Sequence, residues 1–207
     1  MYLPKHFRAE VAETQELLDG IRVADLVSVT TQGLFATFLP LIYDRSQAGE
    51  GALLGHVARK NDHWRLDCVG EALVIAHGPD AYITPAWYAA KQEHGRVVPT
   101  WNYLTAHIYG ELVIHDDPAW LEQLVRRLTD RHEAERAEPW SVDDAPREYT
   151  ESQLLAIVGV ELRITRVEAK AKLGQNRSAQ DIDGVTSGLH ERGDEALAQA
   201  TTRARRN

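Results

Sequence analysis

What this sequence lacks excludes several classes of protein. Cys68 is the only cysteine among 207 residues, so no intrachain disulfide can form and a zinc site of several thiolates cannot be built. No segment reaches about 18 consecutive apolar residues, and the first residues lack the long apolar stretch of a secretory signal. We therefore expect a cytoplasmic protein that does not enter a membrane.

The usual catalytic signatures are missing as well. The sequence contains no G-x-S-x-G elbow, no Walker loop and no H-E-x-x-H motif, and its nine histidines include no i,i+4 pair. These absences argue against hydrolase and zinc-enzyme functions. We expect no metal site.

The charge balance of the chain is acidic. Its formal net charge is −8, which repels a phosphate backbone at long range and makes direct DNA binding doubtful. One local basic run, residues 203–206, is interpreted as a solvated, frayed end. The apolar share of 43% and the charged share of 26% are typical of an ordinary globular protein.

The first part of the sequence has the patterns of a helix followed by short strands. Apolar positions on one face predict a helix over residues 11–21, with Gly20 as its terminator. Two β-branched, apolar runs joined by a polar turn at residues 31–33 indicate a hairpin. The strands predicted in this part are residues 23–30, 34–43, 52–58, 72–76, 81–84 and 106–115.

The second part mixes helices with one strongly alternating strand. Asp117-Pro118 is a helix start signal, and residues 120–128 carry an apolar stripe. Residues 134–146 indicate a loop, and Thr150 with Gln153 predicts a capping box for a helix through Ile157. Alternation over residues 158–165 predicts a strand with one wet face. A short helix over residues 178–189 is expected to precede a fraying tail.

These patterns indicate an α+β fold that is mainly β. Short strands at this spacing favour a barrel, and the lack of regular strand–helix alternation argues against a doubly wound parallel sheet. The length suits one domain with an appended arm. We assign residues 1–172 to the barrel domain and residues 173–207 to a helical C-terminal arm, packed on the barrel or on a partner subunit.

Three regions are richer in polar and aromatic residues than strands require. In residues 55–61, a buried strand runs into Arg59, Lys60 and Asn61, whose donors suit a phosphate, although a solvated strand end has the same composition. Residues 82–88 and 98–107 combine aromatic rings with hydroxyl and amide groups, as a flat, partly polar ring ligand needs. Each tryptophan there is equally well a core residue.

The third region, residues 170–177, crowds cations and amides together just after the final strand. A solvated linker would have a similar composition. However, Gln175, Asn176 and Arg177 precede a helix capped by Ser178, with Asp181 three residues further on. This arrangement is suited to closing over an anionic ligand.

Five short motifs are specific in combination. They are Gly-His-Val-Ala-Arg at 55–59, Ala-Tyr-Ile-Thr-Pro at 81–85, Val-Pro-Thr-Trp-Asn-Tyr at 98–103, Pro-Trp-Ser-Val-Asp-Asp at 139–144 and Lys-Leu-Gly-Gln-Asn-Arg-Ser at 172–178. With the opening residues 1–7, they resemble the PaiB-type family of FMN-binding split-barrel negative transcriptional regulators. The resemblance covers the chain from residue 1 to about residue 190.

This resemblance implies a six-stranded antiparallel split barrel like that of pyridoxamine-phosphate-oxidase-like flavin proteins, with flanking helices. It also implies FMN bound at the interface of a homodimer, with Arg59, Lys60 and Asn61 near the phosphate and Trp101, Asn102 and Tyr103 beside the ring. The cofactor-binding residues that we expect are His56, Arg59, Lys60, Asn61, Thr84, Trp87, Tyr88, Trp101, Asn102, Tyr103, His107, Lys172, Gln175, Asn176 and Arg177.

The sequence departs from the family's pattern at three positions where serine is more usual. Thr84 keeps a hydroxyl group, whereas Ala86 and Gly174 lose one. Each lost hydrogen bond would weaken cofactor retention by about 1 kcal/mol, so we expect the purified protein to be partly empty.

Three functions remain open. The family's label favours a flavin-binding regulator of transcription, acting indirectly because the sequence has no helix-turn-helix pattern. An FMN-dependent oxidoreductase acting on a small molecule needs no protein base, because the cofactor carries the electron chemistry, and His107 or Tyr103 is available for proton transfer. A haem-binding split barrel would use His56 or His107 as the axial ligand.

Overall fold

The computed structural model describes residues 1–47 and 49–205. Contacts divide the chain into two compact units. Unit 1 comprises residues 1–17, residues 77–106 and the chain from Glu168 on, and unit 2 comprises residues 18–76 and 107–167. The domain boundary that we expect between residues 172 and 173 stays a prediction.

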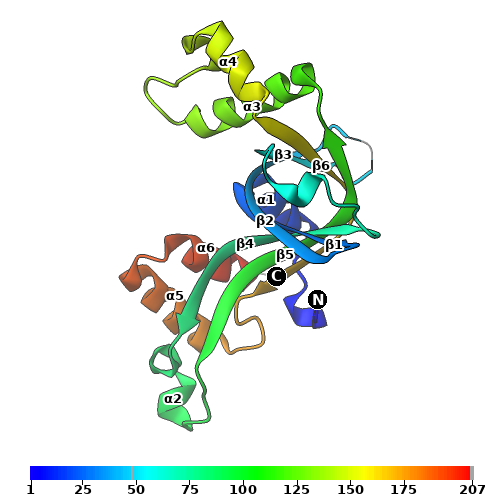
Figure 1. Ribbon diagram of the computed structural model, residues 1–207. Helices are drawn as coiled ribbons and strands as arrows, with labels where there is room; N and C mark the ends of the chain where they lie inside the picture. The colour runs from blue at the N-terminus through cyan, green and yellow to red at the C-terminus, as the bar shows by residue number, and fades with distance from the viewer. Residues whose placement is uncertain (48, 206–207) are drawn as a thin grey trace. The chain divides into compact units, whose positions relative to one another are not determined.

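Unit 2 contains the barrel. Within the described residues, six strands form a closed barrel in the order β1-β2-β3-β6-β5-β4, with antiparallel pairing (Figure 1). This arrangement confirms the predicted fold class. Three of the strands, β4, β5 and β6, continue from one unit into the other. The bounds are β1 (Val23–Thr30), β2 (Gly33–Asp44), β3 (Ala52–Ala58), β4 (Ala72–Ile83), β5 (Thr100–His115) and β6 (Ile157–Lys172).

The strands of unit 2 follow the two-residue period that buries one face. In β1, Ala24, Leu26 and Ser28 are buried, while the residues between them are at least partly exposed. The middle of β3 is buried on both faces. Gly55 is needed there, because a Cβ atom at this position would lie 2.6 Å from the carbonyl oxygen of Pro40 on β2.

Helix α3 (Pro118–Glu133) begins where the sequence predicts. The Asp117 carboxylate accepts hydrogen bonds from the backbone N–H groups of Ala119 and Trp120, at 3.3 and 3.1 Å. The apolar stripe of the helix packs on the barrel, with Trp120 partly buried beside it. The buried cluster consists of Ile42, Ala52, Leu54, Leu124 and Leu128.

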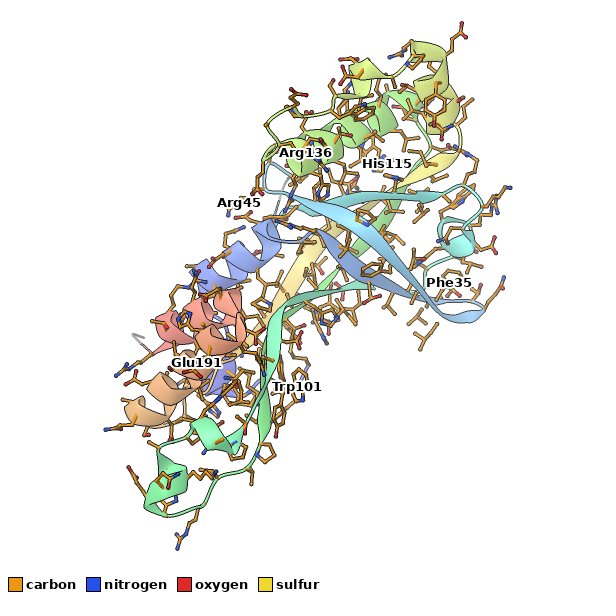
Figure 2. The ribbon with its side chains drawn as sticks, turned by 90° about the vertical axis from the view of Figure 1, so that its left-hand side faces the viewer. Phe35, Arg45, Trp101, His115, Arg136 and Glu191 are labelled. Atoms are coloured by element: carbon orange, nitrogen blue, oxygen red, sulfur yellow. The ribbon has the colours of Figure 1, made fainter. Side chains whose placement is uncertain are left out.

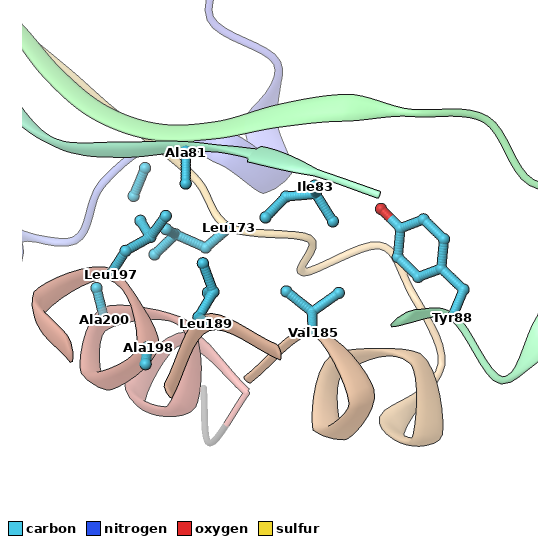
Figure 3. Packing of buried hydrophobic residues seen from close by; sticks show 10 residues of the cluster. Ala81, Ile83, Tyr88, Leu173, Val185, Leu189, Leu197, Ala198 and Ala200 are labelled. Atoms are coloured by element: carbon cyan, nitrogen blue, oxygen red, sulfur yellow. The ribbon is translucent and has the colours of Figure 1, made fainter. Parts of the chain in front are cut away.

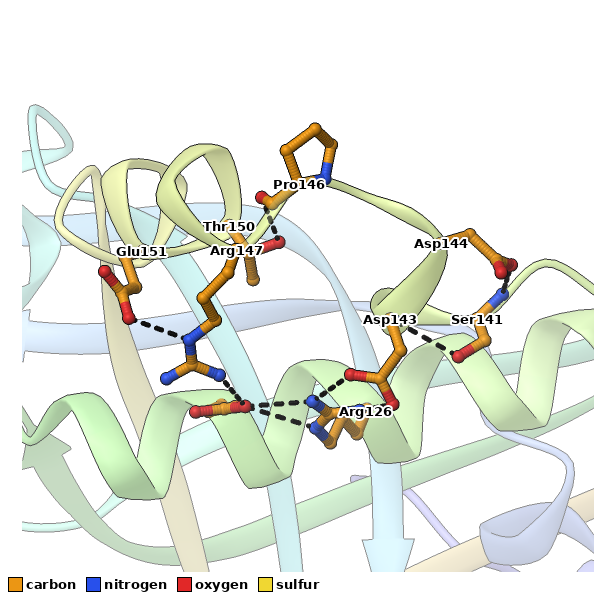
Figure 4. A network of polar contacts seen from close by, with 9 residues as sticks. Arg126, Ser141, Asp143, Asp144, Pro146, Arg147, Thr150 and Glu151 are labelled. Carbon is orange, nitrogen blue, oxygen red and sulfur yellow. Dashed lines mark hydrogen bonds and ion pairs between the residues drawn. The ribbon is translucent and has the colours of Figure 1, made fainter.

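A polar network joins α3 to the short turn η4 (Val142–Asp144) and to helix α4 (Arg147–Leu154), as Figure 4 shows. Arg126 of α3 donates to the Asp143 carboxylate at 2.6 and 2.9 Å and to Glu122 at 3.0 Å. Arg147 donates to Glu122 at 2.8 Å and to Glu151 at 2.7 Å. Ion pairs therefore connect η4 and α4 to α3. The sequence predicts only a loop and a helix in this segment.

The predicted capping box at Thr150 is wrong. Helix α4 starts four residues earlier, with Pro146 in place of Thr150 as the N-cap, and the fixed φ of proline suits a helix entry. The Thr150 hydroxyl instead donates to the carbonyl oxygen of Pro146 at 3.4 Å. The helix ends at Leu154, and Ile157 already belongs to β6.

Two predicted strands, residues 72–76 and 81–84, form the single strand β4. Gly78 and Pro79 interrupt the apolar pattern between them, so the sequence suggests a break. In the structure, Gly78 permits a close approach instead, since a Cβ atom there would lie 2.8 Å from the Cβ atom of Leu104 on β5. Strands β5 and β6 are also longer than predicted, which brings residues 100–105 and 166–172 into the sheet.

Unit 1 has its own apolar core, which Figure 3 shows. Leu173, Leu189 and Leu197 are at most 2% exposed and meet Ile83 from β4. Ser178 caps α5 by accepting a hydrogen bond from the Asp181 N–H at 3.1 Å, as predicted. The short elements and helices are η1 (Lys5–Phe7), α1 (Val11–Asp19), η3 (Pro85–Trp87), α2 (Ala90–Glu93), α5 (Ala179–Arg192) and α6 (Glu195–Ala204).

The predicted fraying tail is wrong, because α6 is a buried helix. Leu197, Ala198 and Thr201 are each at most 1% exposed. The buried residues of α6 are Leu197, Ala198, Ala200 and Thr201, of which only Leu197 is a large apolar residue, so the hydrophobic signal in the sequence is weak. The terminal arginines are also engaged, since Arg203 pairs with Glu16 at 2.9 Å and Arg205 pairs with Asp183. Position 206 of the basic run lies outside the described residues.

The helices differ from spans that cross a bilayer. In the described ranges, no helix combines the length and the apolar content that a membrane span needs. The longest helix, α3, has 16 residues and several charges.

Candidate functional site

The predicted cofactor-binding residues fall into two groups, one in each unit. The unit 1 group is Thr84, Trp87, Tyr88, Trp101, Asn102, Tyr103, Lys172, Gln175, Asn176 and Arg177. The unit 2 group is His56, Arg59, Lys60, Asn61 and His107. Their local surroundings differ in kind.

A cationic cluster, formed by Lys170, Lys172 and Arg177, dominates the unit 1 group. Lys170 and Lys172 alternate on β6, so both project from the same face of the strand. Their Nζ atoms lie 5.4 and 5.8 Å from the ring centroid of Tyr103 on β5. The Lys172 ammonium donates to the Thr100 hydroxyl at 2.5 Å and to the carbonyl oxygen of Trp101.

The three cations of this cluster make no direct ion pair within the described residues, although the buried carboxylate of Asp181 lines the same recess as Tyr88 and Arg177. The oxygen partners of Lys172 are neutral. Burial, Lys170 and Arg177, in that order, lower the pKa of Lys172. A bound anion would remove this repulsion, so the cluster fits an anionic group such as a phosphate.

Arg177 belongs to the cluster through the ring of Tyr88. Its guanidinium carbon lies 4.8 Å from the ring centroid, and Tyr88 itself is 4% exposed. Burial raises the pKa of the Tyr88 phenol, so this group stays protonated at neutral pH. Asn102, only 2% exposed, lines the same small recess as Tyr88 and Arg177.

Gln175 shapes the turn that carries Arg177. Its side-chain amide donates to the carbonyl oxygen of Ala171 at 2.6 Å, and its oxygen accepts from the Leu173 N–H at 2.9 Å. Gly174 in the same turn has a φ of +84°, which glycine adopts without strain. This conformation gives a physical reason for glycine where the family more often has serine.

Trp87 packs against helix α5. A Cβ atom at Gly188 would lie 2.2 Å from the indole of Trp87, and one at Gly184 would lie 2.0 Å from its carbonyl oxygen. The Arg192 guanidinium lies over the same indole at 5.3 Å. The sequence allows Trp87 to be either a core residue or a ligand contact. These packing contacts favour the core role.

Two other aromatic side chains of unit 1 remain accessible. Trp101 is 53% exposed and Tyr82 is 43% exposed, and their rings meet edge to face at 6.3 Å (Figure 2). Thr84 is less available, because its hydroxyl accepts a hydrogen bond from the Ala86 N–H at 3.2 Å and so caps η3. Trp101 and Tyr82 thus offer apolar surface to a flat ligand.

In unit 2, the donors of Arg59 are engaged within the protein. The guanidinium binds both oxygens of Asp116 and donates to the carbonyl oxygens of Leu155 and Ile157, at 2.7 and 3.0 Å. The Asp116 hydrogen bond raises the pKa of Arg59. Contact between Arg59 and a phosphate stays a prediction, and the structure gives this side chain a second, structural role.

Asn61 and His63 form a polar network. The sequence motifs point to Asn61 but not to His63. Asn61 caps the short turn η2 (Asp62–Trp64) by accepting from the His63 N–H at 2.9 Å, and donates to the Thr37 hydroxyl at 3.2 Å. His63, 2% exposed, lies 2.9 Å from the hydroxyls of Thr37 and Ser28. Burial lowers the pKa of His63, so it is neutral at pH 7.

His56 has one polar atom without a protein partner. Its Nδ1 atom is buried and makes no hydrogen bond within residues 1–47 and 49–205. Burial lowers the pKa of the imidazole, which keeps it neutral. His107, on β5, has an interaction of its own. Lys60 lies exposed beyond the end of β3.

Comparison with known proteins identifies the relatives of this chain. Residues 1–166 match the model of the family FMN_bind_2, described as "Putative FMN-binding domain". A Bacillus subtilis protein named Protease synthase and sporulation protein PAI 2 is 32% identical over 193 residues, which cover 91% of this chain and 89% of that protein.

Two solved structures share the fold. The conserved hypothetical protein Rv2991 of Mycobacterium tuberculosis aligns with a TM-score of 0.57 at 11% identity, covering 86% of this chain and 94% of that one. The flavocytochrome Anf3 of Azotobacter vinelandii aligns with a TM-score of 0.56 at 15% identity, covering 81% and 69%. The family match and the Bacillus relative confirm what the motifs predict: the chain belongs to the FMN-binding family FMN_bind_2, and FMN is its cofactor.

Proposed function

We propose that this protein is an FMN-binding regulatory protein in which the cationic cluster of unit 1 holds the phosphate of FMN. The observation that carries the proposal is the gathering of Lys170, Lys172 and Arg177 without carboxylate partners in the described residues. FMN brings a dianionic phosphate that such a cluster binds, and it supplies electron-transfer chemistry when bound.

The aromatic residues of unit 1 support the same assignment. Trp101 and Tyr82 expose ring surface on neighbouring strands, and an isoalloxazine ring needs an apolar face of this kind. Gln175 holds the turn that presents Arg177, and so acts as a positioning residue. The chain's own groups thereby bind the charge of the cofactor and offer a surface to its ring.

The regulatory part of the proposal rests on the relative in Bacillus subtilis, whose name refers to protease synthesis and sporulation. A net charge of −8 argues against tight contact with DNA, so the effect on transcription would be indirect. A gel-shift titration with promoter fragments is expected to show no salt-sensitive binding. Such binding at low protein concentration would contradict the indirect mechanism.

A homodimer is the second part of the proposal, supported by an apolar face of unit 2. Leu34, Ala36, Phe38 and Pro40 alternate outward on β2, and Leu34 and Phe38 are 77% and 66% exposed. Val23 and Val29 extend this face onto β1, where Asp25, opposite Phe38, adds one carboxylate to it. A second copy would present the same exposed apolar side chains, which an isologous two-fold interface could bury against one another.

The dimer is tested by sedimentation of Phe38→Asp. We expect the wild type to sediment as a dimer and the variant, which would bury a charge in the interface, to sediment as a monomer. Thr31→Asp, in the exposed turn of the same hairpin, is the control, because it adds the same charge outside the apolar face. A wild-type monomer would rule out this interface.

The flavin assignment is tested by absorption spectroscopy and by titration with FMN. We expect a yellow protein, and we expect Lys172→Met to weaken FMN binding by about tenfold to a hundredfold, the value of a charge-assisted hydrogen bond. Lys91→Met, an exposed lysine of α2, is the matched control and should bind FMN normally. Equal binding by wild type and Lys172→Met would overturn the phosphate assignment.

Two further observations by absorption spectroscopy separate the alternative functions. A haem spectrum would replace the flavin assignment with the haem-binding function. Bleaching of the bound flavin by a reduced nicotinamide cofactor would favour an FMN-dependent oxidoreductase over a purely regulatory protein.

A further inference from the structure

Unit 1 contains a second cationic feature, which shares Arg177 and Ile182 with the lining of the Tyr88 recess. It is a pocket of about 450 Å³, within the size range of small-molecule sites. The residues that line it are Lys5, His6, Arg8, Glu10, Glu13, Gln175, Arg177, Ala179, Ile182, Ala204 and Arg205. We propose that this pocket binds a phosphate ester the size of a mononucleotide, as a ligand additional to FMN.

Two of the lining cations, Lys5 and Arg8, are carried by a segment whose backbone is held by hydrogen bonds. Arg8 forms a β-bridge with Lys170, and the Ala9 N–H donates to the carbonyl oxygen of Ala169 at 3.1 Å. The Arg8 N–H also donates to the carbonyl oxygen of Lys5 at 3.4 Å, which closes η1. The backbone that carries Lys5 and Arg8 is therefore tied to β6, although both side chains are exposed.

These two cations have no acidic partner. Neither Lys5 nor Arg8 makes an ion pair with a carboxylate in the part of the chain that the structure describes. The chain as a whole carries a charge of −8, so surface cations have many acidic groups available to them. Unpaired cations beside a pocket favour an anion within it, and the arginine fork matches phosphate oxygens.

Further lining residues come from the C-terminal part of unit 1. Arg177 lies in the loop before α5, and Arg205 follows α6, where it is paired with Asp183. Ala179, which also lines the pocket, is the first residue of α5, and the N-terminus of a helix favours a nearby anion. Arg177 therefore adds positive charge to the lining, whereas the charge of Arg205 is balanced by Asp183.

The remaining lining explains why the ligand should be an ester rather than a bare ion. Glu10 and Glu13 line one side, and the Glu13 carboxylate accepts from the Glu10 N–H at 2.8 Å, leaving oxygen lone pairs for hydroxyl groups. Ile182, 7% exposed, and Ala204 add a small apolar surface. Phosphate, hydroxyl-bearing and apolar parts occur together in a nucleoside monophosphate.

The proposal goes beyond FMN binding, and the two can fail separately. The test is calorimetric titration of AMP into the FMN-loaded protein, with flavin absorbance recorded on the same sample. We expect the double variant Lys5→Ala/Arg8→Ala to bind AMP at least about tenfold more weakly than the wild type, with unchanged FMN content. Arg96→Ala, an exposed arginine of unit 1, is the control and should bind AMP as the wild type does.

Three results would overturn the proposal. They are the absence of AMP binding to the wild type, equal binding by wild type and double variant, and release of FMN in proportion to the AMP added, which would make the pocket part of the flavin site. A fourth arm uses adenosine and inorganic phosphate. Adenosine binding as tight as AMP binding would exclude a role for the cations, whereas weak binding of both probes supports recognition of the ester.

Discussion

The two units of this protein differ in the use of the cations that their sequence motifs contain, although unit 1 also has paired cations in Arg203 and Arg205. In unit 2, Arg59, Arg126 and Arg127 are each paired with carboxylates, and the pairs connect elements that are far apart in sequence. In unit 1, Lys170, Lys172 and Arg8 have no such partners within the described residues. A cation in a sequence motif is therefore a ligand candidate only where the fold leaves it without a carboxylate. Arg59 lies in the motif that most resembles a phosphate-binding site, and the fold pairs it with Asp116.

The largest effect is expected from a substitution in the core of unit 1. Gly188→Leu would force a side chain into the indole of Trp87, since even a Cβ atom would lie 2.2 Å from it. We expect a loss of about 3 kcal/mol in the free energy of unfolding, measured by urea titration followed by tryptophan fluorescence. Ser187→Leu, on the exposed side of α5, is the control and should change the free energy of unfolding by less than about 0.5 kcal/mol. A comparable loss in both variants would mean that general effects on the helix dominate.

The structural use of charge in unit 2 predicts an acid dependence centred on Asp44. Burial of this carboxyl raises its pKa, but hydrogen bonds from Ser46 and the ion pair with Arg127 outweigh burial and lower the pKa to about 2. Because the folded pKa is below the unfolded value, the stabilisation is fully present above about pH 4 and is lost as pH falls towards 2.

The corresponding measurement compares the wild type with Asp44→Asn. We expect the variant to be less stable by about 1–2 kcal/mol at pH 6, allowing for solvent around Arg127, and the gap to narrow as the pH falls from 4 to 2.5. A gap that stays constant over this range would assign the effect to packing or hydrogen bonding instead of ionisation.

The smallest effects are expected when one cation of each unit is replaced and the free energy of unfolding is measured in the absence of FMN. Arg127→Met removes the partner of Asp44 and should lower the free energy of unfolding by up to about 1 kcal/mol. Lys172→Met removes a charge that Lys170 and Arg177 repel, and should leave stability within about 0.5 kcal/mol of the wild type or raise it. If both variants lost stability equally, the contrast between the units would disappear.

The elements that the sequence predicts correctly are those with strong local patterns. β1, β2, β3 and the start of α3 follow from alternation, a turn and an N-cap. The break in β4 and the fraying tail are wrong for reasons that lie outside local sequence. Gly78 is required by its close approach to Leu104. Leu197, Ala198 and Ala200 of α6 are buried because they pack in the core of unit 1.

The candidate site is predictable in outline and not in detail. The motifs point to residues 55–61, 82–88, 98–107 and 170–177. The structure brings parts of the last three segments together in unit 1, whereas residues 55–61 and His107 belong to unit 2. Sequence alone does not separate side chains that face a ligand from those that serve the fold. Trp87, Thr84 and Gln175 are engaged in packing, capping and turn formation, whereas Lys170 was left out of the expected set although it alternates with Lys172.

Trp101 contributes to the cationic cluster through its main chain and offers its side chain to solvent. The carbonyl oxygen that holds Lys172 is present whatever residue occupies position 101, while the indole is free to meet a ring ligand. Selection can therefore alter the ring contact without loosening the anchor for negative charge. A protein built in this way can change which molecule it prefers over evolutionary time while keeping its hold on the phosphate.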